Sequence, residues 1–400
     1  MLASSLGWML DGMDITLYTM VIASLLSGLR ISTGMAGALA SITLIASAIG
    51  GVAFGFLADR LGRRTALMAS ISVYSVFTAA CGFAWGITAF AVFRFLLGLG
   101  MGGEWATGAS LVVETWRPEH RGKALGLMQS GFAVGYVLAA AIAALILPRW
   151  GWRAVFFAGI IPACVTLWIR RKVPESPAWL AEQAKPEMRA HGSQPSIIRA
   201  QGGLILLTLL MNSAALFAWW GLFTWIPPYL ALPVSRGGRG LSIAASAGWI
   251  ACMQVGMWLG YVAFGFASDR IGSKRTYIGF LLLAATLAPL YALARSRWWL
   301  LAIGPALAFF GTGHFTGFGI ITAELFPTAH RATIMGLTYN FGRGLSAAAP
   351  LAIGLLAGKW GFESAFWLAA ASFLVAALLA LRLPEGLGAE AQSADNGRPV

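Results

Sequence analysis

Charged residues are scarce in this chain: they make up 11% of its 400 residues, whereas hydrophobic residues make up 58%. Soluble domains carry roughly a quarter charged residues, so the composition excludes an ordinary soluble protein. Cysteine and histidine are rare as well, with three and four copies, and the chain has neither an H-E-x-x-H motif nor a G-x-x-x-x-G-K-[ST] loop. These absences argue against a disulfide framework, a metal site, a membrane-embedded enzyme and ATP-driven transport, and they predict no cofactor.

The hydrophobic residues fall into blocks of the length that a helix needs to cross about 30 Å of hydrocarbon. We therefore predict an all-α integral membrane protein without a soluble domain. Twelve membrane-spanning helices are expected, near residues 5–28, 34–58, 66–83, 86–113, 122–147, 151–171, 202–231, 241–268, 276–294, 297–322, 331–357 and 362–382.

The formal net charge of +13 is distributed unevenly between the two sides of the predicted membrane. Eighteen of the 28 Lys and Arg residues lie in the segments on the side of the termini, eight lie in the opposite loops, and Arg94 and Arg343 lie within spans. This skew follows the positive-inside rule. It predicts a multi-pass protein of the cell inner membrane with both termini cytoplasmic, and it gives no reason to expect a nucleic-acid partner.

An internal repeat organises the chain. Residues 55–64 read GFLADRLGRR and residues 265–275 read GFASDRIGSKR, at an offset of 210. Because six spans separate the copies, both halves enter the membrane in the same orientation, as in transporters built from parallel repeats. We expect a first six-helix bundle, a cytoplasmic linker, a second six-helix bundle and a cytoplasmic tail, at residues 1–171, 172–201, 202–383 and 384–400.

GFLADRLGRR is similar to the signature that the major facilitator superfamily carries between its second and third helices, and RFLLGLGMGGEW (94–105) and PESPAWL (174–180) resemble further signatures of that family. The resemblance covers essentially the whole chain. DGMD in the first span, GGEW in the fourth and YNFGRG (339–344) in the eleventh resemble the organic-acid:proton symporters, namely the sialate/lactate and aromatic-acid groups. The seventh span lacks the paired glutamines typical of sugar porters. The resemblance implies alternating access to a site between the two halves.

Ionisable side chains inside spans cost about 2.5–3.5 kcal/mol each on insertion scales, so they usually face a cavity. We predict that a proton-coupling group comprises Asp11, Asp14, Arg94 and Glu104. We predict that substrate contacts come from Arg343, Asn340, Gln129, Tyr18, His314, Asn212 and Trp220.

Asp11, Asp14 and Tyr18 share one stripe of the first helix. Arg94 reaches a depth comparable to that of Asp14, so an Asp14–Arg94 pair is expected. Such a pair serves either proton coupling or static stabilisation of the bundle. Glu104 is read either as a second titratable site or gate contact, or as a hydrogen bonder between helices.

His314 is the repeat equivalent of Glu104, 210 residues further on, and the same alternatives stand for it. Arg343 is the first choice for a substrate anion, because a guanidinium can clamp a carboxylate with two hydrogen bonds. The alternative is that Arg343 pairs with an acid of the protein. The tryptophans of the seventh span, such as Trp220, either wall a pocket or anchor the helix at the membrane surface.

The resemblance also implies a cytoplasmic gate around the two repeated loops. Its members are Asp59, Arg60, Arg63, Arg64, Glu114 and Arg121 in the first half and Asp269, Arg270, Glu324 and Arg331 in the second. Glycines four apart in spans 2, 5 and 8 permit close helix approach, either for contacts that form and part between the halves or for packing alone. These pairs are Gly51 and Gly55, Gly131 and Gly135, and Gly256 and Gly260.

The predicted function is secondary active transport: proton-coupled uptake of a small organic anion, such as a monocarboxylate or sugar acid, by a monomer that is not an enzyme. The alternative is a proton-coupled transporter of a sugar, a polyol or another neutral solute, in which Arg343 is structural. A sensor or receptor is disfavoured, because the chain has no soluble domain.

Overall fold

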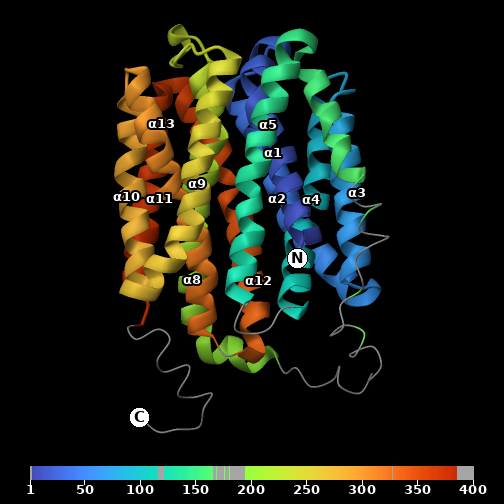
Figure 1. Ribbon diagram of the computed structural model, residues 1–400, viewed down its shortest axis with the longest axis vertical. Coiled ribbons are helices and arrows are strands. Elements are labelled where there is room, and N and C mark those ends of the chain that lie inside the picture. Colours follow the sequence, from blue (N-terminus) through green and yellow to red (C-terminus); the bar gives the residue numbers. More distant parts are fainter. Residues whose placement is uncertain are drawn as a thin grey trace.

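The computed structural model describes residues 2–115, 121–164, 168, 175, 180, 194–326 and 328–384. In these residues the chain forms long helices and no strand, and the helices stand side by side (Figure 1). The helices are α1 (Leu2–Gly28), α2 (Thr33–Leu61), α3 (Arg63–Cys81), α4 (Ile87–Thr115), α5 (Arg121–Phe157), α8 (Gln194–Ala231), α9 (Ile243–Ile271), α10 (Ser273–Leu293), α11 (Arg297–Leu325), α12 (Thr328–Ser346) and α13 (Ala348–Leu381), with short 3-10 turns η2 (Ala158–Ile160) and η4 (Val234–Arg236).

Nine helical stretches in the described part are long and apolar enough to cross a membrane. Two of them, of 38 and 48 residues, are too long for one crossing. Each changes direction at a glycine with positive φ, at Gly151 (φ 73°) in α5 and at Gly361 (φ 82°) in α13. Together with α3, which is less apolar, the stretches of the described residues are consistent with the twelve predicted spans. The prediction of an all-helical membrane fold is confirmed.

The repeat of 210 residues is present in the backbone. Ser32 and Ser242 cap the N-termini of α2 and α9, and each side chain accepts a hydrogen bond from the backbone N–H three residues on. The same offset relates the residues with positive φ. These pairs are Arg30 (52°) with Gly240 (65°), Gly62 (97°) with Gly272 (91°), and Gly151 (73°) with Gly361 (82°). Equivalent turns in the two halves therefore have equivalent backbones.

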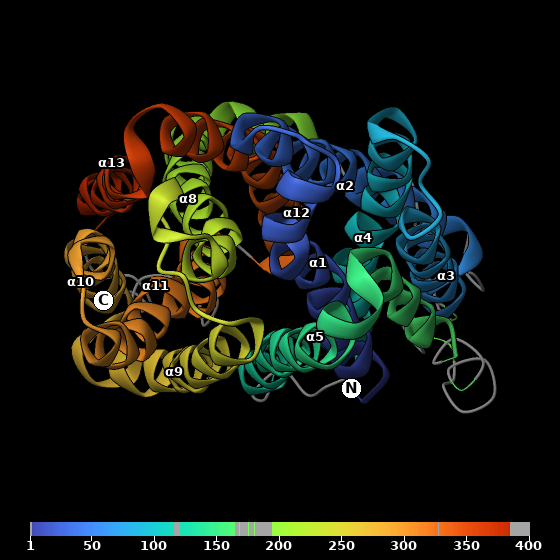
Figure 2. The same cartoon turned by 90° about the horizontal axis from the view of Figure 1, so that it is seen from above.

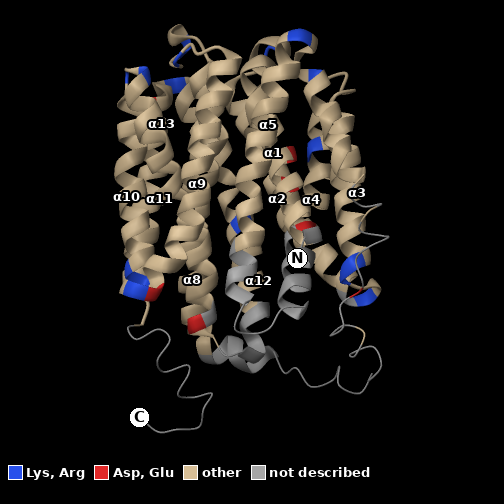
Figure 3. Cartoon of the chain, viewed as in Figure 1, with Lys and Arg blue, Asp and Glu red and all other residues tan. Residues whose placement is uncertain are grey.

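The helices form two groups, α1–α5 and α8–α13, which lie side by side when the molecule is seen from above (Figure 2). They meet along two seams, where α2 lies against α12 and α13 and where α5 lies against α9. We call the end of the bundle with the turns at Arg30 and Gly240 the Arg30 end, and the end with the turns at Gly62 and Gly272 the Gly62 end. Lys and Arg gather at both ends, and acids lie both inside the bundle and at its lower end (Figure 3).

At the Arg30 end the first seam is closed by glycines. A Cβ placed on Gly37 of α2 would lie 2.3 Å from the carbonyl oxygen of Pro350 on α13, and one on Gly34 would lie 2.6 Å from Leu355. A Cβ on Gly354 would lie 2.5 Å from the carbonyl oxygen of Thr33. The two halves are therefore in direct backbone contact at this end.

Only part of the glycine prediction concerns the contact between halves. A Cβ on Gly135 would lie 1.9 Å from the Met9 carbonyl oxygen of α1, and one on Gly260 would lie 2.2 Å from the Phe309 carbonyl oxygen of α11. Gly131 and Gly256 likewise face α1 and α11. The glycine pairs of α5 and α9 therefore serve helix packing inside each half, which is the second of the two alternatives. Gly51, by contrast, faces Asn340 of the other half.

The predicted linker, 172–201, lies outside the described residues except for Glu175, Leu180 and the first residues of α8. The helix α8 bends at Gln201, whose φ of −119° is not helical. Of the predicted tail, 384–400, only Pro384 is described.

Candidate functional site

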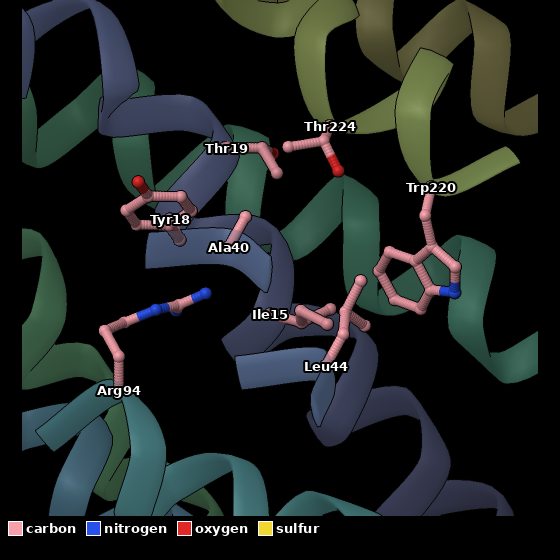
Figure 4. A pocket seen from close by; sticks show the side chains of 8 residues that line it. All are labelled: Ile15, Tyr18, Thr19, Ala40, Leu44, Arg94, Trp220 and Thr224. Carbon is pink, nitrogen blue, oxygen red and sulfur yellow. The ribbon is translucent and has the colours of Figure 1, made fainter. Parts of the chain in front are cut away.

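A pocket lies between the two halves, and eight side chains from four helices line it (Figure 4). They are Ile15, Tyr18 and Thr19 of α1, Ala40 and Leu44 of α2, Arg94 of α4, and Trp220 and Thr224 of α8. Its volume is about 10 Å³, which is close to the space that one water molecule needs. The walls combine one guanidinium, an indole, a tyrosine, two threonines and aliphatic groups. A larger ligand therefore requires the halves to move apart.

Arg94 is the only charged residue of this pocket lining, and it is 1% exposed. Its guanidinium carbon lies 4.1 Å from the centroid of the Tyr18 ring, in the range of a cation–π contact. The Tyr18 hydroxyl donates a hydrogen bond of 2.6 Å to the Ala36 carbonyl of α2, which fixes the ring. The Nε and Nη1 atoms of Arg94 have no hydrogen-bond partner among the described residues. The Tyr18 ring thus holds the cation in position, and two of its nitrogens remain available to a ligand as far as the described residues show.

Asp14 does not contact Arg94. Its Oδ2 accepts a hydrogen bond of 3.0 Å from the Thr78 hydroxyl of α3, and its Oδ1 has no partner in the described part of the chain. The expected Asp14–Arg94 pair is therefore wrong for this structure. The reason is direction: Asp14 points to α3, whereas the guanidinium lies against Tyr18, one helical turn further along α1.

A second set of charged residues spans the contact between the two halves. Arg343 of α12 exerts electrostatic attraction on both Asp11 of α1 and Glu104 of α4. All three side chains are buried, and neither oxygen of Asp11 has a hydrogen-bond partner among the described residues. The Arg343 guanidinium lies 5.7 Å from the ring centroid of Trp220, which also lines the pocket. This second set is therefore linked to the pocket through Trp220.

The buried ions make this region costly to form. Three carboxyl groups and two guanidinium groups are each at most 2% exposed, namely those of Asp11, Asp14, Glu104, Arg94 and Arg343. Buried ionisable groups in a membrane protein are expensive and usually mark a substrate or proton pathway. The structure therefore brings the residues that are predicted to couple protons into one region with Arg343, which is predicted to bind the substrate.

Of the predicted substrate contacts, Tyr18 and Trp220 line the pocket, and Asn212, Asn340 and His314 make contacts elsewhere. Asn212 donates a hydrogen bond of 3.4 Å to the Thr338 carbonyl, which ties α8 to α12. Asn340 donates one of 3.0 Å to Gly336 of its own helix. His314 stacks on Phe315, with ring centroids 4.5 Å apart, and also lies near Tyr277 and Phe373.

The structure does not bring these three side chains to the pocket. Gln129 is half-buried on α5 and is not among the residues that line the pocket either. Three functional candidates were not predicted: Thr19 and Thr224, which line the pocket, and Thr78, the partner of Asp14. Threonines are frequent in membrane helices, and no sequence pattern singled these out.

The predicted gate is described in part. Glu175 accepts a hydrogen bond of 3.1 Å from the backbone N–H of Arg64 at the start of α3, and Glu324 accepts one from the Ser273 hydroxyl at the start of α10. Burial raises the pKa of Glu324 above its usual range, and the bond from Ser273 opposes this shift. Arg60, Asp269 and Arg270 are exposed, and Arg63 is half-buried. The side chains of Asp59, Glu114, Arg121 and Arg331 lie outside the described part.

Comparisons with known proteins identify the family and the fold. The profile of the family described as Major Facilitator Superfamily matches residues 5–253 and 237–398. The sialic acid transporter NanX of Escherichia coli is 31% identical, over 92% of this chain and 89% of its own. The cis,cis-muconate transport protein of Acinetobacter baylyi is 29% identical, over 94% and 91%. The crystal structure of a D-xylose-proton symporter superposes with a TM-score of 0.75 at 20% identity, over 96% and 97%.

Proposed function

Because this chain belongs to the major facilitator superfamily and is therefore a multi-pass membrane transporter of small molecules rather than an enzyme, we propose that it carries a small organic anion together with protons. The observation that carries this proposal is the buried Arg94 guanidinium, which lines a pocket between the halves and whose Nε and Nη1 have no hydrogen-bond partner among the described residues. A carboxylate is the natural ligand of a guanidinium group, because it can accept two parallel hydrogen bonds from it. The relatives named for sialic acid and for cis,cis-muconate favour an organic acid as the substrate.

Arg94 and Arg343 have different roles in this proposal. Arg94 contacts the substrate carboxylate, since it lines the pocket and no acid is among the residues that line it. Arg343, the first choice of the sequence-based prediction for the substrate anion, becomes a second anion contact in this proposal, because it reaches the same tryptophan, Trp220. In the absence of substrate, Arg343 balances the charges of Asp11 and Glu104.

Asp11 is the proposed proton carrier. It is buried, and it lacks hydrogen-bond partners among the described residues. It also interacts electrostatically with Arg343 and with the acids Asp14 and Glu104. Burial favours the neutral acid and a nearby arginine favours the carboxylate. A movement of Arg343 relative to Asp11, as the halves rock, therefore changes the proton affinity of Asp11. Proton release on one side of the membrane and uptake on the other follow from this change.

We also propose that the protein works as a monomer in the cell inner membrane, with the Gly62 end and both termini facing the cytoplasm. The positive-inside skew supports this orientation. The Arg30 end then faces the periplasm or the medium.

One observation favours the alternative of a neutral solute, such as a sugar or polyol. Arg343 already acts on two buried acids of the protein, Asp11 and Glu104, so it can be purely structural. In that case substrate hydroxyls would contact Thr19 and Thr224 in the pocket, and no carboxylate would be needed.

The test is uptake of a panel of labelled monocarboxylates into proteoliposomes, with and without an inward proton gradient. The wild type is compared with Arg94→Ala, Arg343→Ala and the control Arg295→Ala, whose side chain is exposed at the Arg30 end. The proposal expects gradient-stimulated uptake of at least one acid, lost in both buried variants and kept in the control. Uptake of no acid, or uptake indifferent to pH, overturns it. Uptake of labelled sugars or polyols instead would support the alternative.

A further inference from the structure

Tyr136 forms a hydrogen bond between the two halves. Its hydroxyl, on α5, donates a bond of 3.0 Å to the backbone carbonyl of Phe223 on α8, and both groups are buried. An α-helix normally uses each of its carbonyls to accept from the N–H four residues further on. A bond from another helix to such a carbonyl therefore needs an explanation in the sequence of α8.

That explanation is Pro227. It lies four residues after Phe223 inside α8, and proline has no N–H to donate. The Phe223 carbonyl thus loses its partner within the helix, and an unpaired carbonyl in a membrane is costly. Tyr136 supplies the missing donor from the other half. The bond exists because the sequence of α8 leaves an acceptor and the sequence of α5 provides a donor.

The bond acts next to the pocket. Phe223 follows Trp220 by three residues and precedes Thr224, and both of these line the pocket. The side chain of Thr19, from the opposite wall, also interacts with the Tyr136 hydroxyl. Tyr136 therefore holds the α8 wall of the pocket against α1 and α5. It does so in the structure whose halves are in contact at the Arg30 end.

We propose that Tyr136 is a positioning residue of the transport cycle: its bond to the carbonyl freed by Pro227 holds the Arg30 end closed, and opening of that end breaks the bond. The bond has no counterpart in the other half of the repeat. The residue equivalent to Tyr136 is Ser346, whose hydroxyl donates to Arg343 of its own helix. The inference goes beyond the proposed function, because it concerns the opening of the pathway and holds for any substrate.

The test measures how fast a pocket cysteine reacts from each side of the membrane. The background replaces the three native cysteines, Cys81, Cys164 and Cys252, and the reporter is Ala40→Cys on the α2 wall of the pocket. A membrane-impermeant maleimide is added to intact cells or to inverted vesicles. Arg149→Cys, an exposed position close to the Gly151 bend, shows which side the Arg30 end faces.

Tyr136→Phe is expected to raise the reporter's reaction rate from the side of the Arg30 end by about two- to tenfold. This is the change in the opening equilibrium that the loss of one hydrogen bond produces. The rate from the other side should not rise. Pro227→Ala restores a donor within α8 and should shift the rate in the same direction. The double variant should shift it no further than the larger single change, because both remove the same bond. None of these rates requires a known substrate, so failure here is distinct from failure of the proposed function.

Two controls separate this effect from general loosening. Tyr229→Phe also removes a buried tyrosine hydroxyl, which donates to the Ala292 carbonyl within one half. Pro289→Ala also removes a helix proline, in α10. Neither should change the ratio of the two rates. The proposal is overturned if Tyr136→Phe leaves that ratio unchanged or raises both rates alike. It is also overturned if the effects of Tyr136→Phe and Pro227→Ala on the ratio are fully additive in the double variant.

Discussion

Arg94 and Tyr18 form a cation–π pair inside the bundle, 4.1 Å from guanidinium carbon to ring centroid. The pair is rigid, because the Tyr18 hydroxyl is bonded to the Ala36 carbonyl of the next helix. A tyrosine ring stabilises a buried cation without cancelling its charge, whereas an aspartate would cancel it. The pocket consequently keeps a positive charge that an anionic substrate can meet.

The first prediction concerns this pair. Arg94→Lys keeps the charge but loses the planar fork and the stacking surface, so it is not a conservative change at this position. We expect KM for the transported acid to rise about ten- to a hundredfold, the range for a lost hydrogen bond to a charged group. Initial uptake rates in proteoliposomes measure it. Tyr18→Phe, which keeps the ring, should change KM much less. An unchanged KM in Arg94→Lys would contradict a contact between Arg94 and the substrate.

The second prediction separates the two aspartates of α1. Asp11→Asn should abolish proton-driven accumulation while substrate exchange at equal concentrations continues, because the variant cannot release a proton. Asp14→Asn should keep coupling, since an amide oxygen can still accept from Thr78 as the carboxylate does. Proton movement measured with a pH dye inside the vesicles, alongside labelled substrate, gives the ratio directly. Coupling lost in Asp14→Asn and kept in Asp11→Asn would reverse the assignment.

Thr78 offers a matched test of the Asp14 bond. Thr78→Val keeps the shape of the side chain and removes the hydroxyl, which leaves Asp14 with one hydrogen bond fewer. Loss of a buried partner costs about 1–3 kcal/mol, so we expect a lower unfolding temperature in detergent with coupling intact. If Asp14 were held by Arg94 in the resting state, the variant would be as stable as the wild type.

The sequence predicted those features that depend on the order of residues along the chain. The 210-residue repeat located turns whose backbones do match, as at Gly62 and Gly272. Span lengths follow from the thickness of the bilayer, and the family follows from the signature loops. These are properties of single segments, which a sequence carries in full.

The sequence could not predict which way a side chain points around its helix axis relative to a third helix. Counting residues placed Asp14 and Arg94 at similar depth, but depth does not fix direction, and Asp14 points to Thr78 instead. The contact of Gly135 with Met9 rather than with the other half depends on the same missing information. Tyr136 was missed because its partner is a backbone carbonyl that only tertiary structure brings near.

The third prediction concerns pH and Glu324, at the Gly62 end. Burial raises its pKa above the ordinary value, so the folded state binds this proton more tightly than the unfolded chain does. Stability must then fall as the pH rises through the unfolded pKa, about 4.3. Glu324→Gln removes this dependence and still accepts from Ser273. We expect the variant to match the wild type near pH 4 and to unfold at a higher temperature at pH 7, as thermal scans at both pH values would show. The opposite order at pH 7 would indicate that the carboxylate is stabilised by a charge.

The fourth prediction compares two glycines that the sequence treats alike. A Cβ on Gly135 would lie 1.9 Å from the Met9 carbonyl oxygen, whereas a Cβ on Gly55 would have no atom within 4 Å. Gly135→Ala must therefore push α1 and α5 apart, and overpacking of this kind costs about 1–3 kcal/mol. Gly55→Ala meets no obstacle, and alanine in a helix interior is more favourable than glycine by about 0.5–1 kcal/mol.

The two variants should therefore shift the unfolding temperature in opposite directions, down for Gly135→Ala and up for Gly55→Ala. The second half of the repeat supplies the control. A Cβ on Gly260 would lie 2.2 Å from the Phe309 carbonyl oxygen, and a Cβ on Gly265 would have no atom within 4 Å. Thermal unfolding in detergent should show the same contrast for Gly260→Ala and Gly265→Ala. Equal shifts within either pair would mean that the α1–α5 and α9–α11 contacts are looser than the structure shows. The glycine spacing would then serve the movement between halves after all.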